Sequence, residues 1–497
     1  RVMKTDILTE GKQVRNSLIY ILQVSLGYIL PLIAIPIFTR IISPEDYGIL
    51  ALAMIYGIIM SGLANFGVSL AFERNFFQYK DDIRKQSQLL YSSLMFVVGN
   101  FTILAIITYL FNQYISQFLL NSGQYGELIL TTFAGYFFMN TANNFFFIFF
   151  KNSEQAITYT KYRLLINVNN TLCSMFLVLY LRMGVIGIAM GQLVAGASMF
   201  LYLTTIFLKK YNFSISKSIL LESLKISYPL TPRIMFGVLN SQFDKYMISM
   251  LATVSGVGVY YIGKKFSEII FSFMTAIENV FNPQVYQRMF GQHEHSDESI
   301  GKYLMPFLYF STSVALSISL FSEEFITLLT PVSYHGAIPI TTILSIYMGF
   351  LFFGKITGIQ LIYSKKTNII TVITFLSIVL NVGLNIPMII KFGAIGAAGA
   401  SMFAGILSCI IGQVWAQHYY PIRFEWIKVA WIMGTFFTGS IIIISMKLMG
   451  IQYLWTIPVK IITIAIFLNL GFLYGILSKE NYMQVRSIIS FRSKVIL

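Results

Sequence analysis

The feature that most constrains this chain is a series of apolar runs, each of 18 residues or more, spread along all 497 residues. A run of that length, coiled at 1.5 Å per residue, crosses the roughly 30 Å hydrocarbon core of a bilayer. Helices are expected, because a helix satisfies its own backbone hydrogen bonds in lipid and the runs lack the alternation of membrane strands. Fourteen spans are predicted, at residues 16–39, 48–72, 87–111, 128–150, 162–181, 184–208, 227–251, 256–285, 303–322, 338–362, 368–390, 394–416, 427–446 and 455–477.

Composition and charge agree with this count. The chain is 56% hydrophobic and 11% charged, against about 45–50% and about 25% in soluble domains. With the N-terminus in the cytoplasm, the segments on that side hold 25 lysines and arginines, and the opposite side holds only Arg40, Arg182, Lys391 and Lys447. Because cytoplasmic loops are enriched in these residues, both ends are predicted to be cytoplasmic. Anionic lipid headgroups beside the basic loops account for much of the net charge of +15, so no nucleic-acid partner is expected.

The predicted segments also bear on the class of protein. The first span has no small-residue cleavage site, so we expect it to remain in the membrane and not to be a cleaved signal peptide. Cys173 and Cys409 fall inside predicted helices, which argues against a disulfide. The outward loops 112–127 and 323–337 are too short for an external catalytic domain. A transporter is therefore favoured over a membrane enzyme.

One phrase occurs twice. RMGVIGIAMGQL begins at Arg182 and KFGAIGAAGASM begins 209 residues later at Lys391, and Gly48 aligns with Gly258 at an offset of 210. Glycine at such spacings gives a small-residue face for close helix packing, although membrane helices are rich in glycine in any case. Two matches at nearly one offset indicate parallel repeats, as in transporters that work by rocking alternating access. We predict two pseudo-symmetric six-helix bundles, at 1–210 and 211–420, and two additional spans with a cytoplasmic tail at 421–497.

Particular stretches resemble a known family. PIFTRIISPEDYGILALA from Pro36 and GVSLAFERN from Gly67 are similar to the opening of the polysaccharide-biosynthesis export family, within the multidrug/oligosaccharidyl-lipid/polysaccharide exporter superfamily. FDKYMISML, with Asp244 and Lys245, and the run VGVYYIGKK from Val257 resemble that family's seventh and eighth helices. The resemblance implies an all-α membrane protein whose two bundles form a V around a central cavity.

The same resemblance implies a function and a place. The family's members are flippases that move undecaprenyl-diphosphate-linked oligosaccharide, such as an O-antigen or other surface polysaccharide repeat unit, to the outer leaflet of the bacterial inner membrane. The expected partners are a polyprenyl-diphosphate-linked glycan, membrane lipids and polysaccharide assembly proteins. A drug or cation exporter, or an exporter of another lipid-linked precursor, is the alternative within the superfamily.

Charged residues at membrane depth indicate where cargo binds. Each costs about 2.5–3.5 kcal/mol on insertion scales, so it usually faces a partner or a watery cavity. On the seventh span, Arg233, Gly237, Asn240 and Asp244 share one helix face. On the eighth, a polar stripe that lipid would not tolerate is formed by Lys265, Glu268, Ser272, Thr275, Asn279 and Asn282.

From these positions we predict two kinds of site residue. The candidates for binding a diphosphate are Arg233, Lys264, Lys265, Lys355, Asn240 and Asn279. The candidates for proton or sodium coupling are Asp244, Glu268 and Glu278, which could instead neutralise neighbouring lysines. With Lys245 and Lys460, the spans hold six cations and three acids, a balance of +3 that favours an anion. Two alternatives stay open: Lys264 or Lys265 pairs with Glu268, and Lys245 extends to the interface. Lys460, close to the outer end of its span, is expected to extend to the interface.

The first half is nearly free of charge at depth and offers amides and hydroxyls instead. Asn140, Asn143, Asn144, Asn65 and Ser69 suit sugar hydroxyls or hydrogen bonds between helices. Phe145, Phe146 and Phe147 are expected to pack in the core.

Two further patterns are set aside. GFLFFGKIT at 349–357 approaches a phosphate-binding loop, but Ile356 replaces the metal-binding hydroxyl and no strand precedes it. His293 and His295 lie in a polar loop that is not expected to bind metal. No catalytic residue and no cofactor is predicted.

Overall fold

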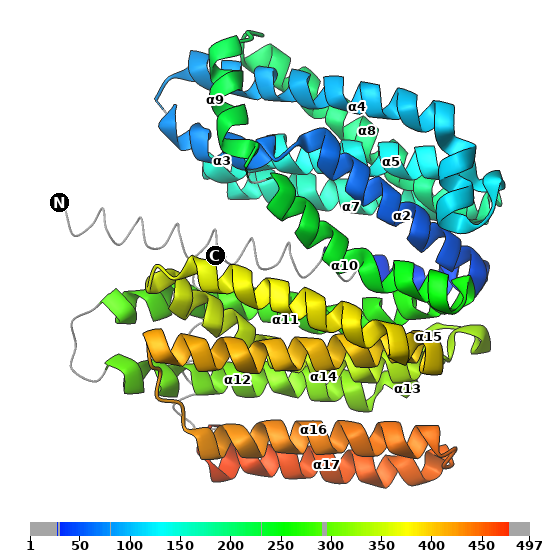
Figure 1. Cartoon of the computed structure of the whole chain (residues 1–497), viewed down its shortest axis with the longest axis vertical. Helices are drawn as coiled ribbons and strands as arrows, with labels where there is room; N and C mark the ends of the chain where they lie inside the picture. The colour runs from blue at the N-terminus through cyan, green and yellow to red at the C-terminus, as the bar shows by residue number, and fades with distance from the viewer. Residues whose placement is uncertain (1–26, 28–29, 80, 230, 291–295, 477–497) are drawn as a thin grey trace, which may run out of the picture. The chain divides into compact units, whose positions relative to one another are not determined.

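The structure is a computed structural model that describes residues 27, 30–79, 81–229, 231–290 and 296–476, and over these it is helical without strands (Figure 1). Its elements are α2 (Pro44–Asn65), α3 (Val68–Gln78), α4 (Ile83–Leu120), η1 (Gly123–Tyr125), α5 (Gly126–Thr141), η2 (Ala142–Phe147), α6 (Ile148–Asn152), α7 (Ala156–Leu179), α8 (Gly184–Lys210), α9 (Lys217–Ser227), α10 (Thr231–Leu251), α11 (Val254–Phe290), α12 (Ser296–Leu320), α13 (Ser322–Leu329), η3 (Val332–Tyr334), α14 (Ala337–Tyr363), α15 (Thr367–Tyr419), α16 (Trp426–Leu448) and α17 (Tyr453–Leu473).

The predicted spans from the second to the fourteenth are helical, although the second crosses the break between α2 and α3, the fourth covers α5, η2 and α6, and the eleventh and twelfth share α15. The first, at 16–39, lies largely outside the described residues, which are helical there over 30–38. By length and composition, 8 helices of the described chain could cross a membrane, and α15 counts once although it contains two predicted spans. The helices α7, α10 and α11 are not among the 8, and they carry many of the polar side chains discussed below. The protein is a multi-pass membrane protein.

The doubled glycine phrase marks two helical hairpins. Gly184 at the start of α8 has φ +56°, and Gly393 breaks α15 with φ 58° and ψ −136°. Both lie in the left-handed region that suits glycine. After the break, α15 returns on itself, because Asn381 donates to Ser401 at 3.1 Å and a Cβ on Gly396 would lie 1.9 Å from the Met388 carbonyl oxygen. The prediction of close helix packing is confirmed at Gly191 and Gly396, whereas a Cβ on Gly184 or Gly393 would meet nothing within 4 Å.

A second pair of glycines forms a reciprocal contact between α2 and the beginning of α11. A Cβ on Gly48 would lie 2.0 Å from the carbonyl oxygen of Val254, and one on Gly258 would lie 1.9 Å from that of Pro44. Val254 follows Pro44 by 210 positions, and Gly258 follows Gly48 by the same number. The two aligned glycines therefore make equivalent contacts with each other's helix.

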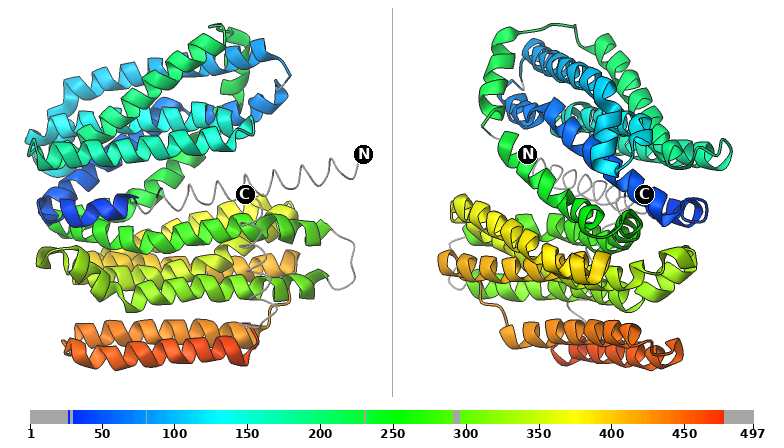
Figure 2. Two further views of the ribbon diagram at one scale, coloured as in Figure 1. Left: turned by 180° about the vertical axis from the view of Figure 1, so that it is seen from behind. Right: turned by 45° about the vertical axis from the view of Figure 1, so that its right-hand side comes forward.

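The chain divides into two compact units, residues 18–261 and residues 1–17 with 262–497. In the first, α5 packs against α2, α4 and α8 around a phenylalanine-rich core that includes Phe133 (Figures 1 and 2). In the second, α14 is the most buried of the candidate spans and packs against α12, α15 and α16. The sequence-based division at 210 and 420 follows the repeat and stays a prediction.

The segment that links the predicted halves belongs to the first unit. Its helix α9 packs on α3 and α4. Glu222 accepts hydrogen bonds from the Tyr79 hydroxyl at 2.7 Å and the Gln78 amide at 3.2 Å, and Asn75 donates to Ser223 at 3.1 Å. Contacts of this kind explain why the unit extends past residue 210.

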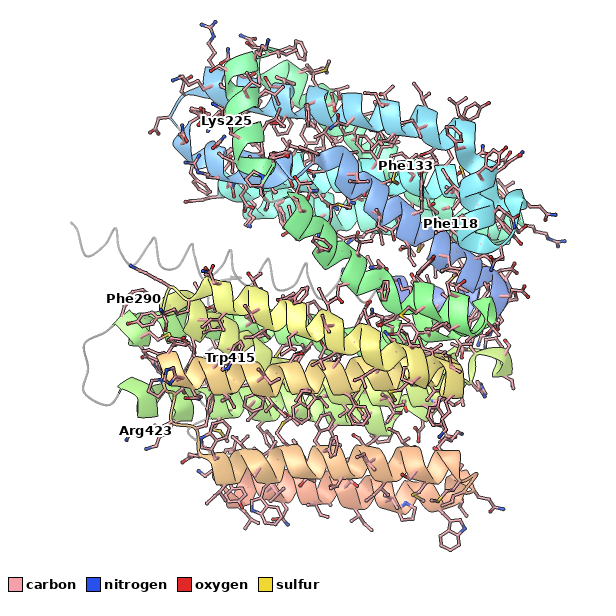
Figure 3. The ribbon with its side chains drawn as sticks, in the orientation of Figure 1. Phe118, Phe133, Lys225, Phe290, Trp415 and Arg423 are labelled. Carbon is pink, nitrogen blue, oxygen red and sulfur yellow. The ribbon has the colours of Figure 1, made fainter. Side chains whose placement is uncertain are left out.

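The two predicted outward loops contain helices, and their surroundings differ. α4 continues to Leu120 after a non-helical residue at Phe111, where the predicted span ends. Beyond it, Phe118 is 69% exposed, whereas Phe133 lies in the core (Figure 3). The corresponding α13 carries Glu323, which pairs with Lys447 at the end of α16. Apolar side chains are exposed in both segments, and the second also holds the C-terminal helix pair.

Candidate functional site

The polar stripe on the eighth predicted span lies along α11, a continuous helix that contains Pro283. Ser272 is buried, Asn279 is exposed, and Lys265, Glu268, Thr275 and Asn282 are partly buried. Asn282 Oδ1 is buried and has no hydrogen-bond partner in the described chain. The stripe is thus neither sealed in the core nor uniformly exposed.

Lys265 and Glu268 form an ion pair one turn apart on α11. The Nζ–Oε2 distance is 2.9 Å, and the side chains are 35% and 26% exposed. This pairing was left open by the sequence, and the structure shows it. Lys264 lies beside it, and the Lys264 carbonyl accepts a hydrogen bond from Ser267 at 2.8 Å.

A second pair joins two helices. Lys355 on α14 approaches Glu278 on α11 at 2.7 Å, with side-chain exposures of 27% and 21%. The Lys355 ammonium also lies 5.3 Å from the centre of the Phe271 ring, within the range of a cation–π contact. The structure therefore brings together a residue predicted to bind substrate and one predicted to couple ions.

The remaining candidates lie on α10, in the unit of residues 18–261. The side chain of Arg233 lies outside the described part, and Asn240 is partly buried. Asp244 is buried and accepts a hydrogen bond from the Tyr260 hydroxyl at 2.8 Å, which ties α10 to the beginning of α11. Lys264, Lys265, Lys355, Asn279, Glu268 and Glu278 belong to the other unit.

Lys460 corrects an expectation. The sequence favoured extension of this lysine to the interface, but the side chain is 2% exposed and its Nζ lies 2.6 Å from Glu324 of α13. Tyr453 donates to the same carboxylate at 2.8 Å. Glu324 was outside the predicted spans, so hydropathy gave no sign that it would pair with a residue 136 positions away.

In the first half, the amide side chains mostly join helices. Asn140 donates to Ser61 at 2.9 Å, and Asn65 Oδ1 accepts from the Ser69 backbone at 3.1 Å. Asn143 lies in the π-helix η2, as does Asn144, and accepts from Arg163 of α7 at 2.8 Å. Helix-to-helix bonding, one of the two interpretations of these residues, is therefore the one that the structure shows for Asn140 and Asn143.

Three other expectations can be compared with the structure. Phe145, Phe146 and Phe147 are fully buried, which confirms packing. Residues 349–357 are helical, which confirms that they are not a phosphate-binding loop. His293 and His295 lie outside the described residues.

Sequence reasoning missed two features of α7. It counted Arg163 only as a loop cation, although its bond to Asn143 reaches a span 20 residues earlier. It also gave no sign of a groove of about 360 Å³ between α7 and α8, lined by Leu165, Val168, Asn169, Leu172, Ser198, Met199 and Tyr202.

Comparison with known proteins adds to this geometry. The family described as polysaccharide biosynthesis protein matches residues 13–289. The chain is 24% identical over 196 residues to a protein of Haloferax volcanii named probable low-salt glycan biosynthesis flippase Agl15. This match covers 39% of the present chain and 42% of that relative, less than half of its length.

Solved structures of low sequence identity share the fold. An inward closed lipid II flippase MurJ gives a TM-score of 0.68 at 16% identity, and the match covers 93% of this chain and 99% of that one. An inward-facing multidrug resistance MATE transporter of the MOP superfamily gives 0.62 at 16% identity, with 79% and 94% covered. A MOP superfamily transporter from Pyrococcus furiosus gives 0.59 at 16% identity, with 82% and 97% covered. The fold is that of MOP superfamily transporters.

Proposed function

This chain belongs to the polysaccharide biosynthesis protein family, and we propose that it is a flippase for a lipid-linked oligosaccharide. It takes an undecaprenyl-diphosphate-linked repeat unit, of an O-antigen or another surface polysaccharide, from the cytoplasmic to the outer leaflet by alternating access. The similarity to a protein named as a probable glycan biosynthesis flippase supports the transporter class. The likeness to a flippase fold over 93% of the chain supports it.

The observation that favours an anionic cargo is the distribution of cations. Lys265 lies on α11 and Lys355 on α14, both in the unit that includes residues 262–497, and both side chains are partly exposed. Hydroxyl and amide side chains follow Lys265 along α11. A diphosphate needs cations, and a glycan needs hydrogen-bonding groups. In the first half, the amides Asn140 and Asn143 are already bonded to other helices, so we assign them a structural role.

Coupling to protons or sodium is part of the proposal. Asp244, Glu268 and Glu278 are the candidate carriers, and each has a polar partner in the structure. We propose that the protein lies in the cytoplasmic membrane of a bacterial cell with both termini inside. Its partners are the polyprenyl-linked glycan, surrounding lipids and polysaccharide assembly proteins.

The test is the fate of the carrier lipid in a strain that lacks only this gene. We expect a polyprenyl-diphosphate-linked glycan to accumulate on the cytoplasmic face, and plasmid-borne wild type to clear it. Unchanged glycolipid and surface polysaccharide, with increased sensitivity to cationic compounds, would instead identify a drug or cation exporter. Accumulation of a different lipid-linked precursor would correct the substrate but keep the class.

A further inference from the structure

The ion pair of Lys355 and Glu278 occupies positions that are apolar in the first repeat. By the repeat, Glu278 corresponds to Val68, since 278 − 210 = 68. Lys355 corresponds to Phe145 or Phe146, since 355 − 210 = 145 and 355 − 209 = 146. All three first-half residues are fully buried in one apolar core. An ion pair at a partly buried position is weak evidence for stability, so the charges call for another explanation.

Lys355 is also more accessible than Lys460, the lysine of another interhelical pair of this unit. Lys460 is 2% exposed and its partner Glu324 is 31% exposed, whereas Lys355 and Glu278 are 27% and 21% exposed. A charged ligand can therefore reach Lys355 without disrupting the surrounding helices. The Lys460 pair serves as a matched structural control.

Other groups beside the pair suit a polar ligand. Asn282, one helical turn after Glu278, has a buried Oδ1 with no partner in the described chain. Asn279 is exposed on the same helix, and Thr275 is partly buried one turn before Glu278. These side chains lie along the polar face of α11 that continues from Lys265.

We infer that Glu278 is a resident counter-ion that a phosphate of the substrate displaces from Lys355. The carboxylate neutralises the lysine while the site is empty, which keeps the cost of a lone cation in the membrane low. An arriving phosphate then forms the charge-assisted hydrogen bond in its place. The inference rests on the proposed function and adds a specific exchange of partners to it.

Binding of farnesyl diphosphate to the purified full chain, with farnesol as the control that lacks phosphate, tests the exchange. We expect Lys355→Ala to weaken binding of farnesyl diphosphate at least ten-fold, because the cation is lost. Glu278→Gln should strengthen it three-fold or more, because the competitor is lost. Lys460→Ala should lower the unfolding temperature without changing the affinity of the protein that remains folded.

A purely structural pair gives other results. In that case Glu278→Gln would weaken binding as much as Lys355→Ala, or leave it unchanged, and either result overturns the exchange. A double variant, Glu278→Val with Lys355→Phe, copies the first half and settles the matter if the single variants do not fold. We expect it to fold and to lose binding, and wild-type binding or failure to fold would contradict the inference. If the wild type itself binds farnesyl diphosphate no better than farnesol, the proposed substrate class fails and not the exchange alone.

Discussion

The two halves of this protein share one helical plan and differ in what that plan carries. α2 begins at Pro44 and α11 at Val254, and the hairpin glycines Gly184 and Gly393 recur 209 residues apart. Yet the ion pair between Glu278 and Lys355 occupies positions that are apolar in the first half. The comparison teaches that the fold depends on the glycines and the apolar pattern, whereas the charges of the second half are additions to it.

The outer helices show the same contrast. Glu324 of α13 corresponds to Tyr114 of α4 at an offset of 210. Tyr114 is exposed, whereas Glu324 binds Lys460 and Tyr453 of α17. One position thus contacts the surroundings in the first half and holds the C-terminal helices in the second.

The largest expected effect concerns the ion pair of Lys460 and Glu324. Lys460→Met should lower the free energy of unfolding by about 3–5 kcal/mol, because it leaves the Glu324 carboxylate without its cation. Thermal unfolding of the purified protein measures this, with Tyr114→Ala as the first-half control, expected within about 0.5 kcal/mol. Equal losses from both variants would break the comparison.

The reciprocal glycines come next. A methyl group on Gly48 or Gly258 would lie about 2 Å from a backbone oxygen, so the helices must separate. Gly48→Ala and Gly258→Ala should each cost about 1–3 kcal/mol, by analogy with overpacking, and reduce export alike. Surface polysaccharide in the complemented deletion strain, with protein quantified alongside, is the measurement. Gly99→Ala on α4, where a Cβ meets open space, should have no effect, and unequal results at Gly48 and Gly258 would show that the halves are not equivalent there.

Removing a cation that is predicted to bind the diphosphate should reduce export almost as much as the glycine substitutions. Arg233→Ala and Lys265→Ala should each abolish most export at nearly normal protein levels, since a charge-assisted hydrogen bond to phosphate is worth about 1.5–3 kcal/mol. Lys265→Arg should retain much of the activity, and Asn140→Ala in the first half should retain nearly all of it. If Lys265 serves only its pair with Glu268, then Glu268→Gln will be as harmful as Lys265→Ala and the double variant will recover function.

The smallest expected effect is local to α9. Burial, followed by the Glu222 carboxylate, raises the pKa of Tyr79 to about 12, so its hydroxyl remains a hydrogen-bond donor even near pH 10, where a free tyrosine is about half ionised. Tyr79→Phe should weaken the docking of α9 by about 1 kcal/mol. Hydrogen exchange should accelerate in 217–227 and stay unchanged in 367–419. Equal acceleration in both segments would mean that α9 is not held by this contact.

Much of the fold could be predicted from the sequence because hydropathy and glycine act locally. Apolar runs predicted the spans. The glycines around Gly393 predicted the turn between two of them, which lies inside α15 at a non-helical residue. The sequence aligned Gly48 with Gly258, but the alignment did not predict that the two glycines would lie at one contact between helices.

The site was only partly predictable, because its pairs join residues far apart in the chain. Lys265 and Glu268 are one turn apart, so helical geometry anticipated them. Lys355 and Glu278 are separated by 77 positions, since 355 − 278 = 77, and no periodicity relates α14 to α11. Glu324 lay outside every predicted span, so nothing marked it as the partner of Lys460.

The reciprocal contact at Gly48 and Gly258 has a consequence for evolution. Two identical subunits that meet on a two-fold axis must change both sides of their interface with every mutation. Two repeats fused in one chain are free of that constraint, because each repeat has its own codons and one can mutate without the other. The two-fold relation between the repeats can then be preserved at Gly48 and Gly258, where the helices meet. Val68 and Glu278, which occupy equivalent positions, can differ, whereas a homodimer would have the same residue at both.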